Sequence, residues 1–404
     1  MFVCRLPIIG KQAVFPMIAG GYSSACKQGH TNYDRREDLM MEKTRIGVVG
    51  CGMISDIYLT NLTGRFGHAV QVMAVSDLSQ DRAAAQAEKY HIPKVMSAQE
   101  MIDSPQIDIL LNLTTPRVHF EICEKALLGG KHIYTEKPLS LSYAQGKRLL
   151  ELAEKRGLYI GCATDTFLGA GLQTCRKLID DGAIGKPLAA TAFMMSHGWE
   201  GAHQNPDFYY LTGGGPMFDM GPYYISALVS LLGPAKEVAA MTSRGFETRT
   251  ILCGPRKGQS IPVEVPTHIT GTIRFETGAV ATVITTFDVW ETPLPFLEIY
   301  GTQGTIVGPD PNTYQGPVLL RSAVDPTPGQ VSMANQYWEN SRGLGLTEMA
   351  LAIKRGEPAR AGGRLGLHVL EIMEGFHRSG QDSRFISLES RCERPRAFIE
   401  ENLI

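Results

Sequence analysis

The chain has 404 residues, of which 43% are hydrophobic and 20% charged, values typical of a globular protein with a sizeable core. This length allows two domains of ordinary size. A formal net charge of -2 excludes an overall basic field that would attract nucleic acid or an anionic membrane, and no run of about 18 apolar residues predicts a transmembrane helix.

Residues 1–43 are expected to form an N-terminal extension outside the folded domains. Their mildly apolar start is interrupted by a lysine and a proline, and charged residues follow the Arg35–Arg36 pair, so a secretion signal is the weaker interpretation. We expect either a disordered segment or translation that begins at Met40 or Met41.

The eight cysteines are scattered along the chain, and no two of them form a CxxC pair. They are Cys4, Cys26, Cys51, Cys123, Cys162, Cys175, Cys253 and Cys392. This usage argues against a zinc site and against a disulfide framework, so no metal is expected. Free thiols fit the reducing cytoplasm, where we expect the protein to reside.

Ordered structure is predicted to begin with a first domain over 44–163. Short β-branched runs at 45–50, 71–77, 108–114, 131–136 and 158–164 predict strands, and the patterns at 81–90, 117–128 and 143–157 predict helices. This alternation indicates βαβ units and therefore a parallel sheet that is covered by helices on both faces.

The pattern changes over the second predicted domain, 164–404. Helices are expected at 172–182, 346–356 and 364–380, and strands at 187–197, 268–275, 279–290, 296–302 and 305–308. Consecutive strands joined by short turns, such as Glu276-Thr277-Gly278, predict an open and mainly antiparallel sheet. The predicted fold class is thus α/β, with a dinucleotide-binding Rossmann domain followed by a second α/β domain.

A glycine turn directly after the first strand carries the strongest local signal. Gly50 permits a tight turn, Gly52 lets the backbone approach a pyrophosphate, and Met53 and Ile54 lead into a helix whose N-terminus stabilises the phosphates. Ser55 stands at the third glycine position of the fingerprint, where a small residue still allows close packing.

Asp77 ends the next strand, at about the distance expected of a carboxylate that holds ribose hydroxyls. It would repel a 2′-phosphate, so NAD is predicted over NADP. Arg82 lies nearby and could soften that preference, which keeps NADP possible. The alternative is a structural turn with an aspartate that faces solvent.

Two further segments carry a resemblance to a known family. The first is Asn112-Leu-Thr-Thr-Pro-Arg-Val-His119, with Glu136-Lys137-Pro138 at the end of a later strand. The second is Gly213-Gly-Gly-Pro-Met-Phe-Asp-Met-Gly-Pro-Tyr223 in the other domain. Over about residues 44–390 the chain resembles the Gfo/Idh/MocA family, which includes glucose–fructose oxidoreductase and inositol dehydrogenase.

The resemblance implies a substrate site between the nicotinamide and the open sheet. It also implies homodimers or homotetramers that form through that sheet. By the same resemblance, Glu136 and Lys137 would lie near the nicotinamide ribose. The residues implied to border the cofactor further along are Thr114, Thr115, Pro116 and His119.

Oxidation of an alcohol needs a hydride acceptor, a base and a positive partner for the developing oxyanion. Lys137 can supply the positive partner, although a lysine before proline is otherwise an ordinary exposed turn residue. Asp219 and Tyr223 stand four apart, so both would project from one face if their segment is helical. Tyr223 replaces the histidine common in the family pattern. We expect it to relay the proton with a pKa lowered by Lys137, while Asp219 orients the substrate or Lys137. A core tyrosine beside a structural aspartate is the alternative.

The polar loop before the glycine run, 196–210, is rich in aromatic residues and histidine. Trp199 is expected to contact a polyol, because aromatic faces stack on the C–H surfaces of sugars. His197 or His203 could be the base, or both could simply be solvated. The segment 335–343, with Trp338 and Arg342, is a weaker candidate for the pocket wall.

Three functional hypotheses follow. The first is an NAD(P)-dependent oxidoreductase that acts on a secondary hydroxyl of a sugar, polyol or glycoside. The second uses the same groups for transient oxidation of a glycoside, elimination of the aglycone and re-reduction. The third is a dinucleotide sensor without activity, which the presence of Lys137 and Asp219 argues against.

Overall fold

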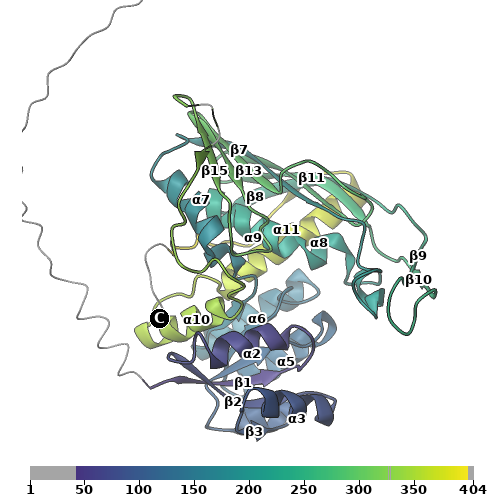
Figure 1. The fold of residues 1–404 in the computed structure, drawn as a ribbon, viewed down its shortest axis with the longest axis vertical. Helices are drawn as coiled ribbons and strands as arrows, with labels where there is room; N and C mark the ends of the chain where they lie inside the picture. The colour runs from purple at the N-terminus through teal and green to yellow at the C-terminus, as the bar shows by residue number, and fades with distance from the viewer. Residues whose placement is uncertain (1–41, 326, 328, 399–404) are drawn as a thin grey trace, which may run out of the picture. The chain divides into compact units, whose positions relative to one another are not determined.

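The structure, a computed structural model, describes residues 42–325, 327 and 329–398. The expectations about residues 1–41 lie outside the described part of the chain. The described residues form one compact unit that contains two large sheets and a two-stranded hairpin (Figure 1).

The first sheet has six parallel strands in the order β3-β2-β1-β4-β5-β6. Its strands are β1 (Thr44–Val49), β2 (Val70–Ser76), β3 (Lys94–Val95), β4 (Ile109–Asn112), β5 (His132–Thr135) and β6 (Ile160–Cys162). The connecting helices are α2 (Ser55–Thr63), α3 (Gln80–Lys89), α4 (Ala98–Asp103), α5 (Pro116–Leu128) and α6 (Tyr143–Arg156). The chain order reverses between β1 and β4, which makes their carboxyl ends the expected place for a ligand.

The second sheet has nine strands in the order β16-β15-β14-β13-β7-β12-β11-β8-β17. All neighbours are antiparallel except β7 and β12, which run parallel. The strands are β7 (Pro187–Met195), β8 (Ala235–Ser243), β11 (His268–Phe275), β12 (Val280–Thr286), β13 (Leu297–Gly301), β14 (Gly304–Gly308), β15 (Leu319–Ser322), β16 (Gly329–Gln330) and β17 (Ile386–Ser387). A separate hairpin pairs β9 (Thr248–Thr250) with β10 (Ser260–Pro262).

Helices cover one face of this large sheet. They are α7 (Ala170–Asp180), α8 (Gly215–Asp219), α9 (Gly221–Leu232) and α11 (Gly363–Asp382), with short 3-10 turns at Thr166–Leu168 and Pro206–Tyr209. α10 (Leu344–Arg355) instead packs against β6 of the parallel sheet. α11 contacts β8 and α9 on one side and α6 and β6 on the other, so it lies between the two sheets (Figure 1). A β-bridge between Gly161 and Gly362 joins the late segment to the edge of the parallel sheet.

The predicted fold class is confirmed, and most predicted elements are present with ends moved by one to three residues. The boundary between 163 and 164 stays a prediction. The strand expected at 279–290 ends earlier, at Thr286, because Asp288 turns away to pair with Arg249. The six cysteines in the described part of the chain are free.

Within the same described part, no helix is both long and apolar enough to cross a membrane.

Candidate active site

The turn after β1 has the geometry that a dinucleotide phosphate requires. Gly50 has a φ of +105°, and a Cβ there would lie 2.6 Å from the carbonyl carbon of Leu113, so only glycine fits. At Gly52 a Cβ would meet nothing within 4 Å, which leaves open space beside the turn. Ser55 begins α2 and closes the turn by donating its hydroxyl proton to the carbonyl oxygen of Gly52 at 2.6 Å.

Asp77 follows β2 and faces this turn. One carboxylate oxygen accepts the backbone N–H of Cys51 at 2.8 Å, and the other accepts the backbone N–H of Ser79 and the guanidinium of Arg82. Burial alone would raise the pKa of Asp77, but these donors hold it below its ordinary value. The carboxylate is therefore charged at neutral pH and lies at the end of the strand where a ribose would bind.

Contacts of His119 hold the loop after β4 in place. Its Nδ1 lies 2.8 Å from the carbonyl oxygen of Pro138 and its Nε2 lies 3.0 Å from that of Thr114, and the side chain is fully buried. His119 thus ties the start of α5 to the segment after β5, and its place at the border of the cofactor, which the family resemblance implies, stays a prediction. Thr115 and Pro116 form the beginning of α5.

The end of β5 supplies the cation of the site. The ammonium of Lys137 donates to the carboxylate of Asp219 at 2.8 Å and also to the backbone carbonyl of Asp219. The other carboxylate oxygen of Asp219 accepts the indole N–H of Trp199 at 2.9 Å. Three residues that the sequence had proposed separately are therefore in direct contact.

Tyr223 lies against the same ammonium. The Nζ of Lys137 is 5.3 Å from the centroid of the Tyr223 ring. Asp219 ends α8 and Tyr223 stands in the first turn of α9, so two short helices place the pair, and not the single helix considered from the sequence. On the side of β5 that faces α2, the hydroxyl of Tyr58 donates to Glu136 at 2.8 Å.

The charge states of Lys137 and Tyr223 follow from burial and neighbours. Burial disfavours the ammonium, but the carboxylate of Asp219 outweighs it, so the pKa of Lys137 is raised above its ordinary value. Burial raises the pKa of Tyr223 above its ordinary value, although Lys137 and Arg342 both act to lower it. The net lowering of the Tyr223 pKa expected from the sequence is therefore wrong, because desolvation dominates.

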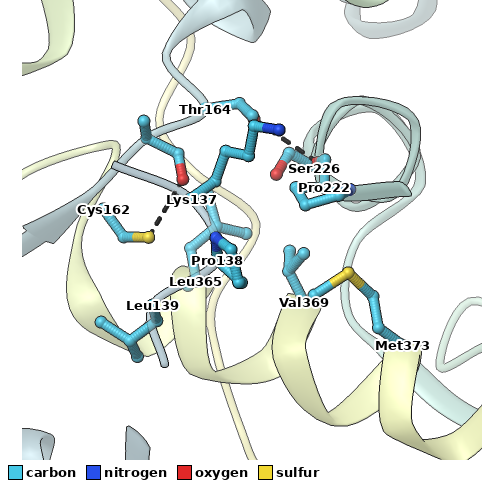
Figure 2. A pocket seen from close by; sticks show the side chains of 12 residues that line it. Lys137, Pro138, Leu139, Cys162, Thr164, Pro222, Ser226, Leu365, Val369 and Met373 are labelled. Atoms are coloured by element: carbon cyan, nitrogen blue, oxygen red, sulfur yellow. Dashed lines mark hydrogen bonds between the residues drawn. The ribbon is translucent and has the colours of Figure 1, made fainter. Parts of the chain in front are cut away.

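Behind Lys137 the packing is tight. A cavity of about 10 Å³ lies there, at the limit for a single water molecule. Figure 2 shows its walls, which come from the segment after β5, from Cys162 at the end of β6 and Thr164 after it, from Pro222 and Ser226 on α9, and from Leu365, Val369 and Met373 on α11. The cavity is too small for a substrate. Its apolar lining packs against the methylene chain of Lys137.

Comparison with known proteins identifies the chain's relatives. Residues 44–163 match the family model described as "Oxidoreductase family, NAD-binding Rossmann fold", and residues 172–307 match the "GFO/IDH/MocA C-terminal domain". The chain belongs to the Gfo/Idh/MocA family. It is accordingly an NAD-dependent oxidoreductase.

Several named proteins are similar to this chain over most of their length. The 1,5-anhydro-D-fructose reductase of Ensifer adhaerens is 26% identical over 304 residues, which is 72% of this chain and 84% of the relative. The myo-inositol 2-dehydrogenase of Thermotoga maritima is 25% identical over 355 residues, 85% of this chain and 98% of the relative.

Among solved structures, levoglucosan dehydrogenase in complex with NADH and L-sorbose has the same fold. It superposes with a TM-score of 0.73 at 21% identity and covers 86% of this chain and 99% of that one.

The residues present fit a bound NAD. The open space at Gly52, the charged Asp77 and the start of α2 at Ser55 provide for the pyrophosphate and the adenosine ribose. Glu136 and Lys137 stand at the carboxyl end of β5, where the nicotinamide half would bind. When bound, the cofactor would supply the hydride acceptor or donor. The accompanying proton must then be transferred by a group of the protein.

The two loop histidines lie outside the Lys137 cluster. His197 stacks on Trp290 with ring centroids 3.4 Å apart and packs edge-on against Phe246. Burial lowers the pKa of His197, and its Nδ1 is buried without a partner. His203 accepts the backbone N–H of Asn205 at 3.1 Å. Neither ring contacts Lys137, Asp219 or Tyr223 among the interactions of the described residues.

Sequence reasoning missed or underrated three contributors to the site. Tyr209 stacks on Trp199 with centroids 5.5 Å apart, which fixes the indole that holds Asp219. Buried Arg249 pairs with Glu200 at 3.0 Å and thereby anchors the loop of Trp199. Arg342, considered only as a pocket wall, places its guanidinium carbon 6.0 Å from the centroid of the Tyr223 ring. The contacts of Arg249 and Arg342 join distant segments, so no local pattern could have found them, whereas Tyr209 lies in the loop 196–210 that the sequence had indicated.

No group of three or more possible metal-ligating side chains occurs among the residues that the structure describes.

Proposed function

We propose that this protein transfers a hydride between NAD(H) and a secondary carbon of a sugar, polyol or glycoside. The observation that carries the proposal is the contact of Lys137 with both Asp219 and Tyr223 at the carboxyl end of the dinucleotide-binding sheet. The names of its relatives support the substrate class, since they include a sugar reductase, an inositol dehydrogenase and, in Escherichia coli, a D-glucoside 3-dehydrogenase.

Lys137 is the proposed electrophile of the site. Its ammonium is permanently charged and would donate to the reacting oxygen, which stabilises negative charge as it develops there. Asp219 keeps that ammonium in place and in turn is held by Trp199. Trp199 and Tyr209 then form a wall on which the C–H face of a sugar can stack.

Tyr223 is the proposed proton carrier. With its raised pKa it is a neutral phenol at rest, so in the direction of carbonyl reduction it can give its proton to the new alkoxide. In the direction of oxidation the phenolate takes the proton of the substrate hydroxyl. A second assignment, with His197 or His203 as the base, lacks any contact with Lys137 in support of it.

The test is turnover on a panel of sugars, polyols and glycosides, and of their keto forms, followed by NADH absorbance and by mass spectrometry of the products. We expect reversible NADH turnover on at least one secondary alcohol and its ketone. Release of an aglycone without net NADH change would instead indicate the glycoside-cleaving alternative. Activity that survives Lys137→Ala unchanged would overturn the proposed site.

The proposal extends to assembly and location. The face of the large sheet away from the helices carries Met241, which is 77% exposed, together with the paired Thr270 on β11. We propose that this face joins subunits into a homodimer or homotetramer in the cytoplasm. Light scattering should report more than one chain for the wild type and a smaller particle for Met241→Arg.

A further inference from the structure

Arg342 lies beside Tyr223, although it belongs to neither the glycine motifs nor the Glu136-Lys137-Pro138 motif. It lies in the loop before α10, half-buried, with its guanidinium carbon 6.0 Å from the centroid of the Tyr223 ring. Its donors go to the side-chain oxygens of Asn340 and Asn312, each at 2.8 Å.

These acceptors are all uncharged. No carboxylate lies within salt-bridge distance of Arg342 among the described residues. The guanidinium keeps its full charge in this setting, because an arginine does not deprotonate in proteins. No ion pair within the described part of the chain therefore holds this charge, although Glu136, Asp165 and Asp310 interact with it at longer range.

The loop that carries Arg342 is fixed from two sides. The side-chain amide of Asn61 on α2 donates to the carbonyl oxygens of Asn340 and Arg342 at 2.9 and 2.8 Å. The carboxylate of Asp165, 2% exposed, accepts the backbone N–H groups of Gly343 and Gly345 at 3.2 and 2.9 Å. Groups held this firmly can fix the direction of a neighbouring side chain.

The positions of two charges bear directly on Tyr223. The guanidinium carbon of Arg342 lies 6.0 Å and the Nζ of Lys137 lies 5.3 Å from the centroid of the Tyr223 ring. Positive charges this close favour the anionic form of the phenol over the neutral form.

We infer that Arg342 is a positioning residue that acts through Tyr223: its charge, held in place by the loop before α10, stabilises the phenolate left after proton transfer. The inference rests on the proposed role of Tyr223. In carbonyl reduction the O–H bond of Tyr223 breaks, its proton joins the substrate oxygen, and the electron pair stays on the phenolate oxygen. The proton is later recovered from water, and oxidation runs the same steps in reverse.

Tyr223 is faced by several charged or titratable groups. Lys137 and Glu136 approach from the end of β5, Arg342 from the loop before α10, and Tyr314 and Tyr209 from the remaining sides. Lys137 and Arg342 favour the phenolate, whereas Glu136 opposes it. Removing Arg342 therefore leaves Lys137 as the one favourable neighbour among these five.

The experiment measures the acidity of Tyr223 directly, without turnover. 3,5-Difluorotyrosine, which is more acidic than tyrosine, is placed at position 223 of the full chain, and its titration is followed by fluorine NMR. We compare the wild-type background with Arg342→Gln and Arg342→Lys. Arg65→Gln is the matched control, because Arg65 donates to Ser341 in the same loop at 2.9 Å but lies over Tyr337.

In Arg342→Gln the signal should titrate roughly one pH unit or more above the wild-type background, or stay protonated to the end of the accessible range. The titration midpoint of Arg342→Lys should lie between those of the wild-type background and Arg342→Gln, and the midpoint of Arg65→Gln should match the wild type. An unchanged titration in both Arg342 variants would overturn the inference. So would a tenfold loss of NADH affinity in calorimetry with an unchanged titration, which would assign Arg342 to the cofactor phosphates.

The two proposals fail separately. If the substrate panel shows no hydride transfer, the proposed function is lost, whereas the fluorine titration still reports whether Arg342 controls the Tyr223 phenol. If Tyr223→Phe keeps full activity, the proton carrier is wrong whatever the titration shows.

Discussion

The ammonium of Lys137 and the carboxylate of Asp219 meet at 2.8 Å, although 82 positions separate them in the chain. Lys137 extends from the carboxyl end of a Rossmann strand, and Asp219 ends a short helix beneath the large sheet. Both side chains are only 15% exposed, so the pair is poorly screened by solvent. The contact therefore joins the end of the parallel sheet to the domain of the large sheet, and it holds the cation that we propose as the partner of the oxyanion.

Replacing Asp219 by Asn should reduce kcat by ~10²-fold or more. The amide removes the charge that holds the ammonium, and its single oxygen cannot replace both carboxylate oxygens that accept from Lys137 and from the Trp199 indole, so the Lys137 side chain loses its direction. NADH affinity, measured by calorimetry, should stay within about threefold, because Asp77 and the Gly50 turn remain intact.

The matched control is Asp108→Asn. Asp108 also pairs with a cation, Arg45, at 2.6 Å. This pair lies at the opposite end of the parallel sheet, where the strands β1 and β4 begin. The Asp108→Asn variant should keep kcat unchanged. An Asp219→Asn enzyme with the activity of that control would show that the ion pair serves folding alone.

Tyr223→Phe should lower kcat by ~10²-fold or more, since the ring would keep its packing but lose its exchangeable proton. Tyr224→Phe is the control, because Tyr224 is the neighbouring tyrosine of α9 and bonds Asp310 at 3.1 Å, away from Lys137. A loss under threefold in Tyr223→Phe would retire Tyr223 as the proton carrier.

Local patterns predicted much of this fold for identifiable reasons. The β-branched runs and their spacing gave the parallel sheet, and the alternation over 268–275 matched β11 at both ends. Gly278 makes the turn before β12 with a φ of +87°, as its position suggested. Such features depend on neighbours in sequence, which is why a single chain reveals them.

Contacts between distant segments were harder to predict. The break between α8 and α9 at Met220 depends on how both helices pack, and no spacing rule shows that Asp219 and Tyr223 still converge. The raised pKa of Tyr223 could not be predicted either, because the burial that causes it exists only in the folded chain. The same holds for His119, whose two carbonyl partners come from different loops.

Asp77→Ser should shift the cofactor preference toward NADP by roughly tenfold or more in the ratio of Kd values. The substitution removes the charge that repels a 2′-phosphate. It also releases Arg82, which bonds Asp77 at 2.7 Å and is 60% exposed. Calorimetry with NADH and NADPH checks the ratio. In Asp77→Ser/Arg82→Gln the gain for NADPH should vanish; a gain that persists would mean that Arg82 does not bind the phosphate.

Stability should fall steeply as the pH drops from about 6.5 toward 4. Burial lowers the pKa of His368 to about 4 and that of His377 to about 4, whereas unfolded histidine titrates near 6.5. Between these two pKa values each histidine is protonated in the unfolded chain but neutral in the folded chain. Each histidine should therefore lower the free energy of unfolding by about 2 kcal/mol at about pH 5.

Urea unfolding at pH 7.5 and pH 5 measures this loss, with His377→Leu as the informative variant. The Nε2 of His377 is buried without a partner and its ring packs against Phe218, so an apolar replacement keeps the contact and removes the titration. His368 instead accepts the N–H of Ala235 at 2.9 Å, and its loss would also break a hydrogen bond. His377→Leu should retain about half of the pH-dependent loss. A variant as acid-sensitive as the wild type would show that His377 is protonated in the folded chain.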